Sequence, residues 1–182
     1  MVRWAARHAL EGLRDMQLGF GEQEARITWK GRSGWKLVDI LPQLILDVNK
    51  ARRKPDIIIL HCGTNDLGSV PHHLIQRAMR SNFNEVFQSA PGAIILWSDI
   101  IPRKAYSVAF STVKVDKARK KVNKFARKLL LGPRGGVIEH AISYKQSHLY
   151  GNRDEVHLSG AGNSVLVAEW KEAIQSYLAV WR

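Results

Sequence analysis

An acidic residue and a histidine three positions apart could carry proton-transfer chemistry near the end of the chain. They lie in "DEVHLSGAGN" at 154–163, where Asp154 precedes His157 and a glycine-rich turn follows. An aspartate that accepts a hydrogen bond from one imidazole nitrogen leaves the other nitrogen able to act as a base. The same residues are also typical of a helix cap or a loop ion pair beside a surface histidine, so this stretch alone leaves both interpretations open.

Two glycine-containing loops could donate hydrogen bonds to the same chemistry. "HCGTNDLG" contains Gly63, Thr64, Asn65 and Asp66 directly after an apolar run, and "WKGRSGW" contains Gly34. An amide side chain or a glycine N–H in such a loop can approach a ligand closely and stabilise negative charge on it. Both compositions are also common in simple turns.

Alternating apolar patterns predict the elements that must position these loops. We expect strands in 25–31, 55–63, 93–101 and 135–142, and helices over 4–14, 35–48, 72–88, 112–131 and 161–181, with Pro42 marking a kink or an early boundary. Helices that alternate with strands favour a three-layer α/β/α sandwich with a mainly parallel sheet, in which active groups gather at the carboxyl ends of strands. The length of 182 residues predicts a single domain over 1–182.

The charge is strongly positive. Lys and Arg number 28 against 16 Asp and Glu, which gives +12 and favours attraction to polyanions. The helix expected around 112–131 carries much of this charge, and its apolar positions, Phe125 among them, are expected to face the core. It is either a solvated face or a patch for nucleic acid or anionic membrane, without interleaved aromatic residues for base stacking. Its basic residues are Lys114, Lys117, Arg119, Lys120, Lys121, Lys124, Arg127 and Lys128.

Several features bear on location and cofactors. Cys62 is the single cysteine and cannot form an intramolecular disulfide, and the charged N-terminus does not have the apolar core of a signal peptide. No apolar run approaches the ~18 residues of a transmembrane helix. We therefore expect an intracellular, cytoplasmic protein, and the spacing of histidines and acidic residues predicts no metal or other cofactor.

Taken in order, "GRSG", "GTND" and "DEVHLS" resemble the SGNH (GDSL-like) hydrolases, a family of esterases and lipases with a flavodoxin-like fold. Gly34 matches the second of the family's four sequence blocks, Asn65 the third, and Asp154 with His157 the fourth. The resemblance implies that the Gly34 N–H and the Asn65 side chain form an oxyanion hole. It also implies that His157 is the general base of a Ser-His-Asp mechanism of carboxylic ester hydrolysis and that Asp154 orients it.

The family's first block, which carries the nucleophilic serine at the end of the first central strand, has no counterpart before "VRWAARHAL". The resemblance therefore implies a sheet without its first central strand and a domain that is inactive as this chain, either a pseudoenzyme or a fragment. Ser33 and Cys62 are weaker alternatives as nucleophiles, and Ser159 is expected to cap the last helix. The alternative function is a non-catalytic module that binds nucleic acid or anionic membrane through its basic surface.

Overall fold

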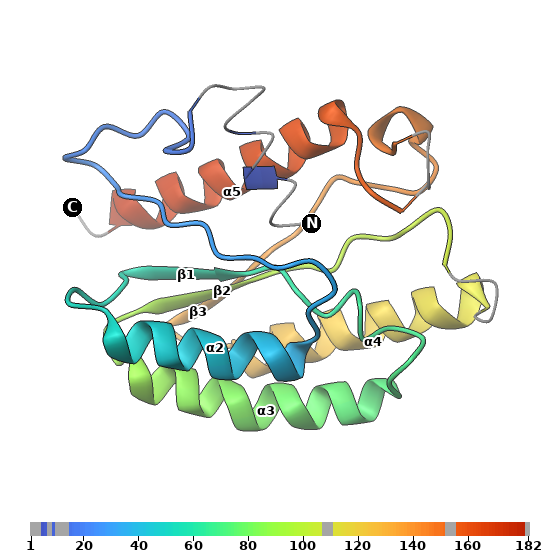
Figure 1. Cartoon of the computed structure of the whole chain (residues 1–182), viewed down its shortest axis with the longest axis horizontal. Coiled ribbons are helices and arrows are strands. Elements are labelled where there is room, and N and C mark those ends of the chain that lie inside the picture. The colour runs from blue at the N-terminus through green and yellow to red at the C-terminus, as the bar shows by residue number, and fades with distance from the viewer. Residues whose placement is uncertain (1–4, 7–8, 10–14, 107–110, 152–155, 181–182) are drawn as a thin grey trace. The chain divides into compact units, whose positions relative to one another are not determined.

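The computed structural model describes residues 5–6, 9, 15–106, 111–151 and 156–180 (Figure 1). Contacts divide the chain into two compact units, and each is described by itself. The first unit comprises residues 1–33, 101–106 and 140–182, and the second comprises 34–100 and 107–139.

A parallel sheet forms the centre of the second unit. Its strands are β1 (Ile57–Leu60), β2 (Ile94–Ser98) and β3 (Gly135–Ile138), in the order β1-β2-β3. In the register, Ile58 pairs with Ile95 on β2, and Ile95 pairs with Gly135 on β3. All five residues of β2 are buried, which is the burial that a continuous apolar run predicts for a strand covered on both faces. The three strands confirm the predictions made for 55–63, 93–101 and 135–142.

Three helices belong to the same unit and lie on one side of the sheet in Figure 1. They are α2 (Leu37–Lys50), α3 (His72–Ser89) and α4 (Thr112–Leu129), and α3 contacts both α2 and α4. Pro42 does not end α2, so the early boundary predicted there is wrong. The core of the unit contains one apolar face from each helix and the inner strand, with Leu41, Ile75, Phe83, Trp97 and Val122 among its fully buried side chains.

A buried asparagine on α4 was not predicted. Asn123 is 5% exposed, and its Oδ1 accepts hydrogen bonds from Ile100 N at 3.0 Å and Trp97 Nε1 at 3.3 Å. Its Nδ2 donates to Ile100 O at 3.1 Å. The indole N–H of a buried tryptophan needs an acceptor, and the chain leaving β2 needs partners for its backbone. Asn123 meets both needs and ties α4 to the end of β2.

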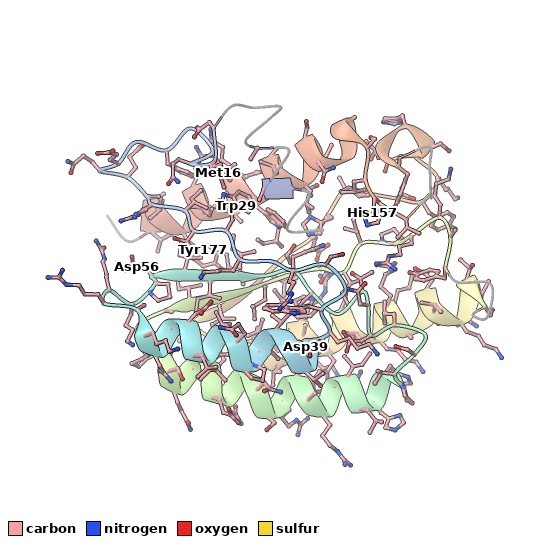
Figure 2. All side chains as sticks on the ribbon, viewed as in Figure 1. Met16, Trp29, Asp39, Asp56, His157 and Tyr177 are labelled. Carbon is pink, nitrogen blue, oxygen red and sulfur yellow. The ribbon has the colours of Figure 1, made fainter. Side chains whose placement is uncertain are left out.

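The first unit contains the long helix α5 (Gly160–Val180) and a short 3₁₀ turn, Ser147–Leu149. Residues 25–31 do not form the predicted strand. The backbone of Ile27 is instead paired with the side chain of Gln17, whose Oε1 accepts from Ile27 N at 2.7 Å and whose Nε2 donates to Ile27 O at 3.2 Å. Trp29 Nε1 donates to Met16 O at 2.8 Å (Figure 2). The centroid of the Trp29 ring lies 5.8 Å from that of Trp170.

Of the helix predicted over 4–14, the described residues Ala5, Ala6 and Ala9 are helical. The helix α5 confirms the prediction for 161–181 to within a residue at each end. The structure therefore confirms the α/β class with a parallel sheet. Among the described residues, no helix is both long and apolar enough to cross a membrane.

Candidate functional site

The two loops predicted to donate hydrogen bonds are joined in the second unit. Asn65 lies in the turn that follows β1, and its side chain is exposed. Its Nδ2 donates to Trp35 O at 2.9 Å. Trp35 is the neighbour of Gly34, whose φ of +78° is a left-handed conformation that favours glycine. One hydrogen bond thus brings the Asn65 amide beside the backbone of the glycine loop.

Asp66 also connects the same two loops, through a buried hydrogen bond. Its side chain is 3% exposed, and its carboxylate accepts the Leu37 N–H, with Leu37 N lying 3.1 Å from Oδ2 and 3.4 Å from Oδ1. Leu37 is the first residue of α2, so Asp66 caps that helix from the neighbouring turn. Burial raises the pKa of Asp66 above its ordinary value, and the Leu37 N–H and the charge of Lys36 offset the rise only in part.

Gly63 is required where the chain leaves β1. Its φ is +94°, and a Cβ at this position would lie 2.9 Å from Ile100 Cδ1. Thr64 beside it is buried. These two residues hold the turn against the core, and Asn65 is the member of the motif that faces outward. Gly63, Thr64 and Asp66 are buried and support the turn, whereas Asn65 is exposed and can reach a ligand.

His157 lies in the first unit, just before α5 (Figure 2). Its side chain is half-buried, and its carbonyl oxygen accepts from Gly151 N at 2.8 Å. The next residue, Leu158, forms an antiparallel bridge with Tyr150. The backbone of His157 is therefore held on the side that leads into α5. Asp154 lies outside the described residues, so its orientation of His157 stays a prediction.

The residues after His157 are occupied by the start of α5. Ser159 Oγ accepts from Gly162 N at 3.2 Å and donates to His148 O at 2.7 Å. This confirms that Ser159 caps the last helix. A Cβ at Gly162 would clash with Leu149 O, which explains the glycine in "SGAGN" by a close approach of two backbones.

The alternative nucleophiles differ in exposure. Cys62 is buried. Its burial, and to a smaller extent the negative charge of Asp66, raises the pKa of its thiol, so the thiol stays protonated and packs in the core. Ser33 is exposed in the turn before Gly34. A hydrogen bond of 2.8 Å between His61 Nδ1 and Ser98 Oγ was not predicted. The available signal was that both polar residues come at the carboxyl ends of apolar runs that form neighbouring parallel strands. Ser98 is fully buried, so a substrate cannot reach its hydroxyl.

No family model matches the sequence, and no curated protein matches it significantly. Solved structures do match. One is an acetyl esterase, a serine-to-alanine variant with acetate ion, with 16% identity over 84% of this chain and 72% of that chain and a TM-score of 0.66. Another is a family 3 carbohydrate esterase from Clostridium thermocellum, with 16% identity over 99% and 88% and a TM-score of 0.65. A GDSL-like lipase from Bacteroides thetaiotaomicron has 16% identity over 97% and 84% and a TM-score of 0.68.

These matches show the fold. The chain has the α/β fold of the GDSL-like lipases and acetyl esterases, which is the SGNH hydrolase fold that the three short motifs predicted.

Proposed function

We propose that this chain is an esterase-like domain of the SGNH type, in which the Gly34 N–H and the Asn65 amide bind the carbonyl oxygen of a small ester. His157 is the general base in this proposal, and Asp154 orients it. The observation that carries the proposal is the hydrogen bond from Asn65 Nδ2 to Trp35 O at 2.9 Å, because it holds the Asn65 amide against the residue that follows Gly34.

The chemistry follows from where charge develops. Attack on an ester carbonyl turns its oxygen into an oxyanion, and donors that are already in place stabilise that charge without reorganisation. The bond to Trp35 O uses one of the two hydrogens of the Asn65 amide nitrogen and restricts the rotation of that amide.

In the full mechanism, His157 would take the proton of a serine hydroxyl as that oxygen attacks the carbonyl, and would return the proton to the leaving alcohol. We assign no residue of the chain to the nucleophile. The proposal is therefore that residues 1–182 bind the acyl group and its carboxylate product but turn esters over negligibly. One of the matched structures is a serine-to-alanine variant of an acetyl esterase with acetate ion, and acetate is accordingly the simplest probe.

A titration with sodium acetate, followed by nitrogen–proton NMR, tests the oxyanion hole in the protein as it is. We expect saturable shifts at the Gly34 backbone amide and the Asn65 side-chain amide. Asn65→Ala should weaken acetate binding by about tenfold, because a hydrogen bond to a charged group contributes about 1.5–3 kcal/mol.

The matched control is Asn82→Ala. Asn82 is also an asparagine whose Nδ2 donates to a backbone carbonyl, that of Ala78 at 2.7 Å, but it lies within α3. It should leave acetate binding unchanged. The proposal fails if sodium chloride at equal ionic strength produces the same shifts, or if Asn65→Ala and Asn82→Ala behave alike.

A further inference from the structure

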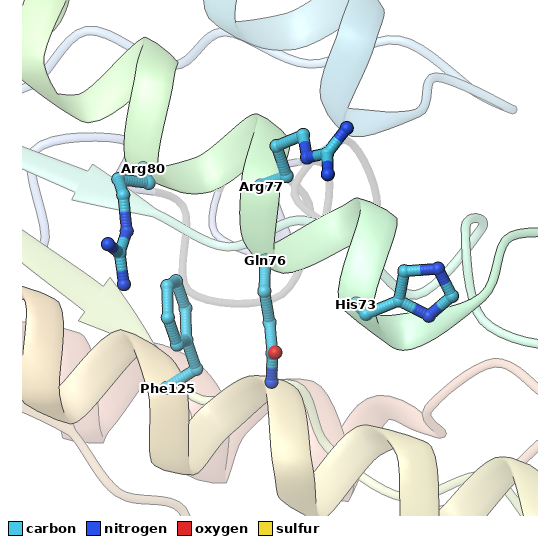
Figure 3. A pocket seen from close by; sticks show the side chains of 5 residues that line it. All are labelled: His73, Gln76, Arg77, Arg80 and Phe125. Atoms are coloured by element: carbon cyan, nitrogen blue, oxygen red, sulfur yellow. The ribbon is translucent and has the colours of Figure 1, made fainter.

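A groove of about 300 Å³ lies between α3 and α4 in the second unit (Figure 3). Four of its lining residues come from α3 at positions i, i+3, i+4 and i+7, which is one face of a helix. The fifth is Phe125 of α4, and in Figure 3 Arg80 and Gln76 reach from α3 toward that helix on either side of its ring. The lining residues are His73, Gln76, Arg77, Arg80 and Phe125.

Phe125 corrects the prediction that it faces the core. The fully buried stripe of α4 runs through Val122 and Ala126, and Asn123 extends it on the side away from Phe125. Successive residues are about 100° apart around a helix, so Phe125 lies at the margin of that stripe. Its ring is half-exposed, and the guanidinium carbon of Arg80 lies 5.5 Å from the ring centroid.

A stripe of lysines runs along α4 beside this ring. Its members are spaced by three and four residues in turn, so they share one side of the helix over about 21 Å. All are exposed, and Lys121 is placed next to α3 because Gln76 Nε2 donates to its carbonyl oxygen at 3.1 Å. We call Lys114, Lys117, Lys121, Lys124 and Lys128 the lysine stripe.

The other basic residues of α4 form ion pairs with acidic side chains of the same unit. Arg119 and Lys120 pair with Asp116, and Arg127 pairs with Asp99 at 2.5 Å and with Glu139. Within the described part of the chain, no ion pair includes the lysine stripe.

The positive field of this region acts on neighbouring groups. Partial burial, the charge of Lys121 and the neighbouring His73 together lower the pKa of His72 at the start of α3. Like charges three and four residues apart also repel and destabilise their own helix. No acidic side chain lines the groove, so a bound polyanion would relieve this repulsion.

We propose that the groove and the lysine stripe bind single-stranded nucleic acid, with phosphates on Arg77 and the lysines and an unpaired base on the Arg80–Phe125 pair. Charge alone would fit a duplex, polyphosphate or an anionic membrane equally well. The aromatic ring and the guanidinium beside it favour an unpaired base, because bases of single strands stack on aromatic and guanidinium planes.

Fluorescence anisotropy of a short labelled oligodeoxyadenylate tests the location of binding. The groove variant is Arg77→Gln, Lys121→Gln and Lys124→Gln combined, and the matched control is Lys50→Gln, Arg52→Gln and Arg53→Gln at the exposed end of α2. Each removes three positive charges, taking the net charge from +12 to +9. The groove variant should bind at least about tenfold more weakly at low salt. Its plot of the logarithm of the binding constant against the logarithm of the salt concentration should have a slope that is less steep by about 2, since each phosphate contact on a single strand contributes about 0.7 to that slope. The control should remain close to the parent chain.

Phe125→Leu tests the stacking. It should weaken the oligonucleotide about fivefold or more but leave inorganic polyphosphate binding unchanged, with melting temperatures confirming that both proteins are folded. The proposal is overturned if the groove and control variants lose affinity equally, or if Phe125→Leu binds the oligonucleotide like the parent. It is also overturned if phosphatidylserine vesicles are bound and the oligonucleotide is not.

Discussion

At the scale of single residues, burial assigns different tasks to Asn65 and Asp66, which are neighbours in one turn. Asn65 is exposed and Asp66 is 3% exposed. The sequence predicted that this turn matters, because four small or polar residues follow an apolar strand. It could not predict that Asp66 accepts from Leu37 N, because that contact depends on where α2 begins in space.

The raised pKa of Asp66 predicts a pH dependence of stability. Because the folded-state pKa lies above the ordinary value of 3.8, folding takes up a proton between the two values. The contribution of Asp66 to stability therefore falls as the pH rises through its folded pKa. Asp66→Asn removes this titration, so its melting temperature relative to the parent should rise as the pH increases above the ordinary pKa of 3.8.

Thermal unfolding followed by circular dichroism across that range measures the difference. Asp56→Asn, which changes an exposed carboxylate at the start of β1, is the control and should show no comparable trend. A difference for Asp66→Asn that is flat or falls with pH would contradict the assignment.

At the scale of elements, the sequence predicts well those segments whose apolar pattern agrees with the contacts they make in the fold. The apolar run of β2 is buried along its whole length and that of β1 at every second residue, so composition suffices to predict both strands. Residues 25–31 also have a strand composition, but a side chain, that of Gln17, pairs with Ile27 where a neighbouring strand would have done so. Phe125 was misassigned and the burial of Asn123 was not predicted, because helical spacing gives a face but not its margins.

The helix α5 is held by a pair of hydrogen bonds that sequence reasoning did not find. Glu169 Oε1 accepts from Ala141 N at 2.8 Å, and Oε2 lies 2.5 Å from His140 Nδ1. The His140 side chain is only 2% exposed. Removing the carboxylate would leave the buried imidazole without this acceptor, which costs about 1–3 kcal/mol, whereas the exposed Ala141 N–H can bond to water instead.

Glu169→Ala should therefore lower the free energy of unfolding by about 1–3 kcal/mol. Urea denaturation gives the value directly. Glu172→Ala makes the same substitution at an exposed position of the same helix and should change stability by less than about 0.5 kcal/mol. Equal losses for the two variants would show that the pair with His140 and Ala141 does not hold α5.

At the scale of the whole molecule, the expected catalytic groups are divided between the two units. Gly34 and Asn65 belong to the second unit and His157 to the first. The sequence predicted the fold class because predicted helices alternate with predicted strands and its motifs occur in the order of the family's blocks, and solved esterase structures match most of the chain. Motif order cannot predict how such groups are spaced, since their distances depend on packing between segments far apart in the sequence.

The proposed division of roles makes a prediction for the 182-residue chain itself. A base and an oxyanion hole without a nucleophile lose the covalent step, and only the smaller acceleration from binding and charge stabilisation remains. We expect no labelling by a fluorophosphonate probe and no hydrolysis of p-nitrophenyl acetate distinguishable from buffer, beside a serine esterase as the positive control.

Ser33 is the residue at which this prediction can fail. It is exposed and adjoins Gly34, so a probe can reach it, whereas Ser98 is fully buried and Ser159 is used as the cap of α5. Labelling that peptide mass spectrometry maps to Ser33, and that Ser33→Ala abolishes while Ser69→Ala does not, would make the glycine loop the source of the nucleophile.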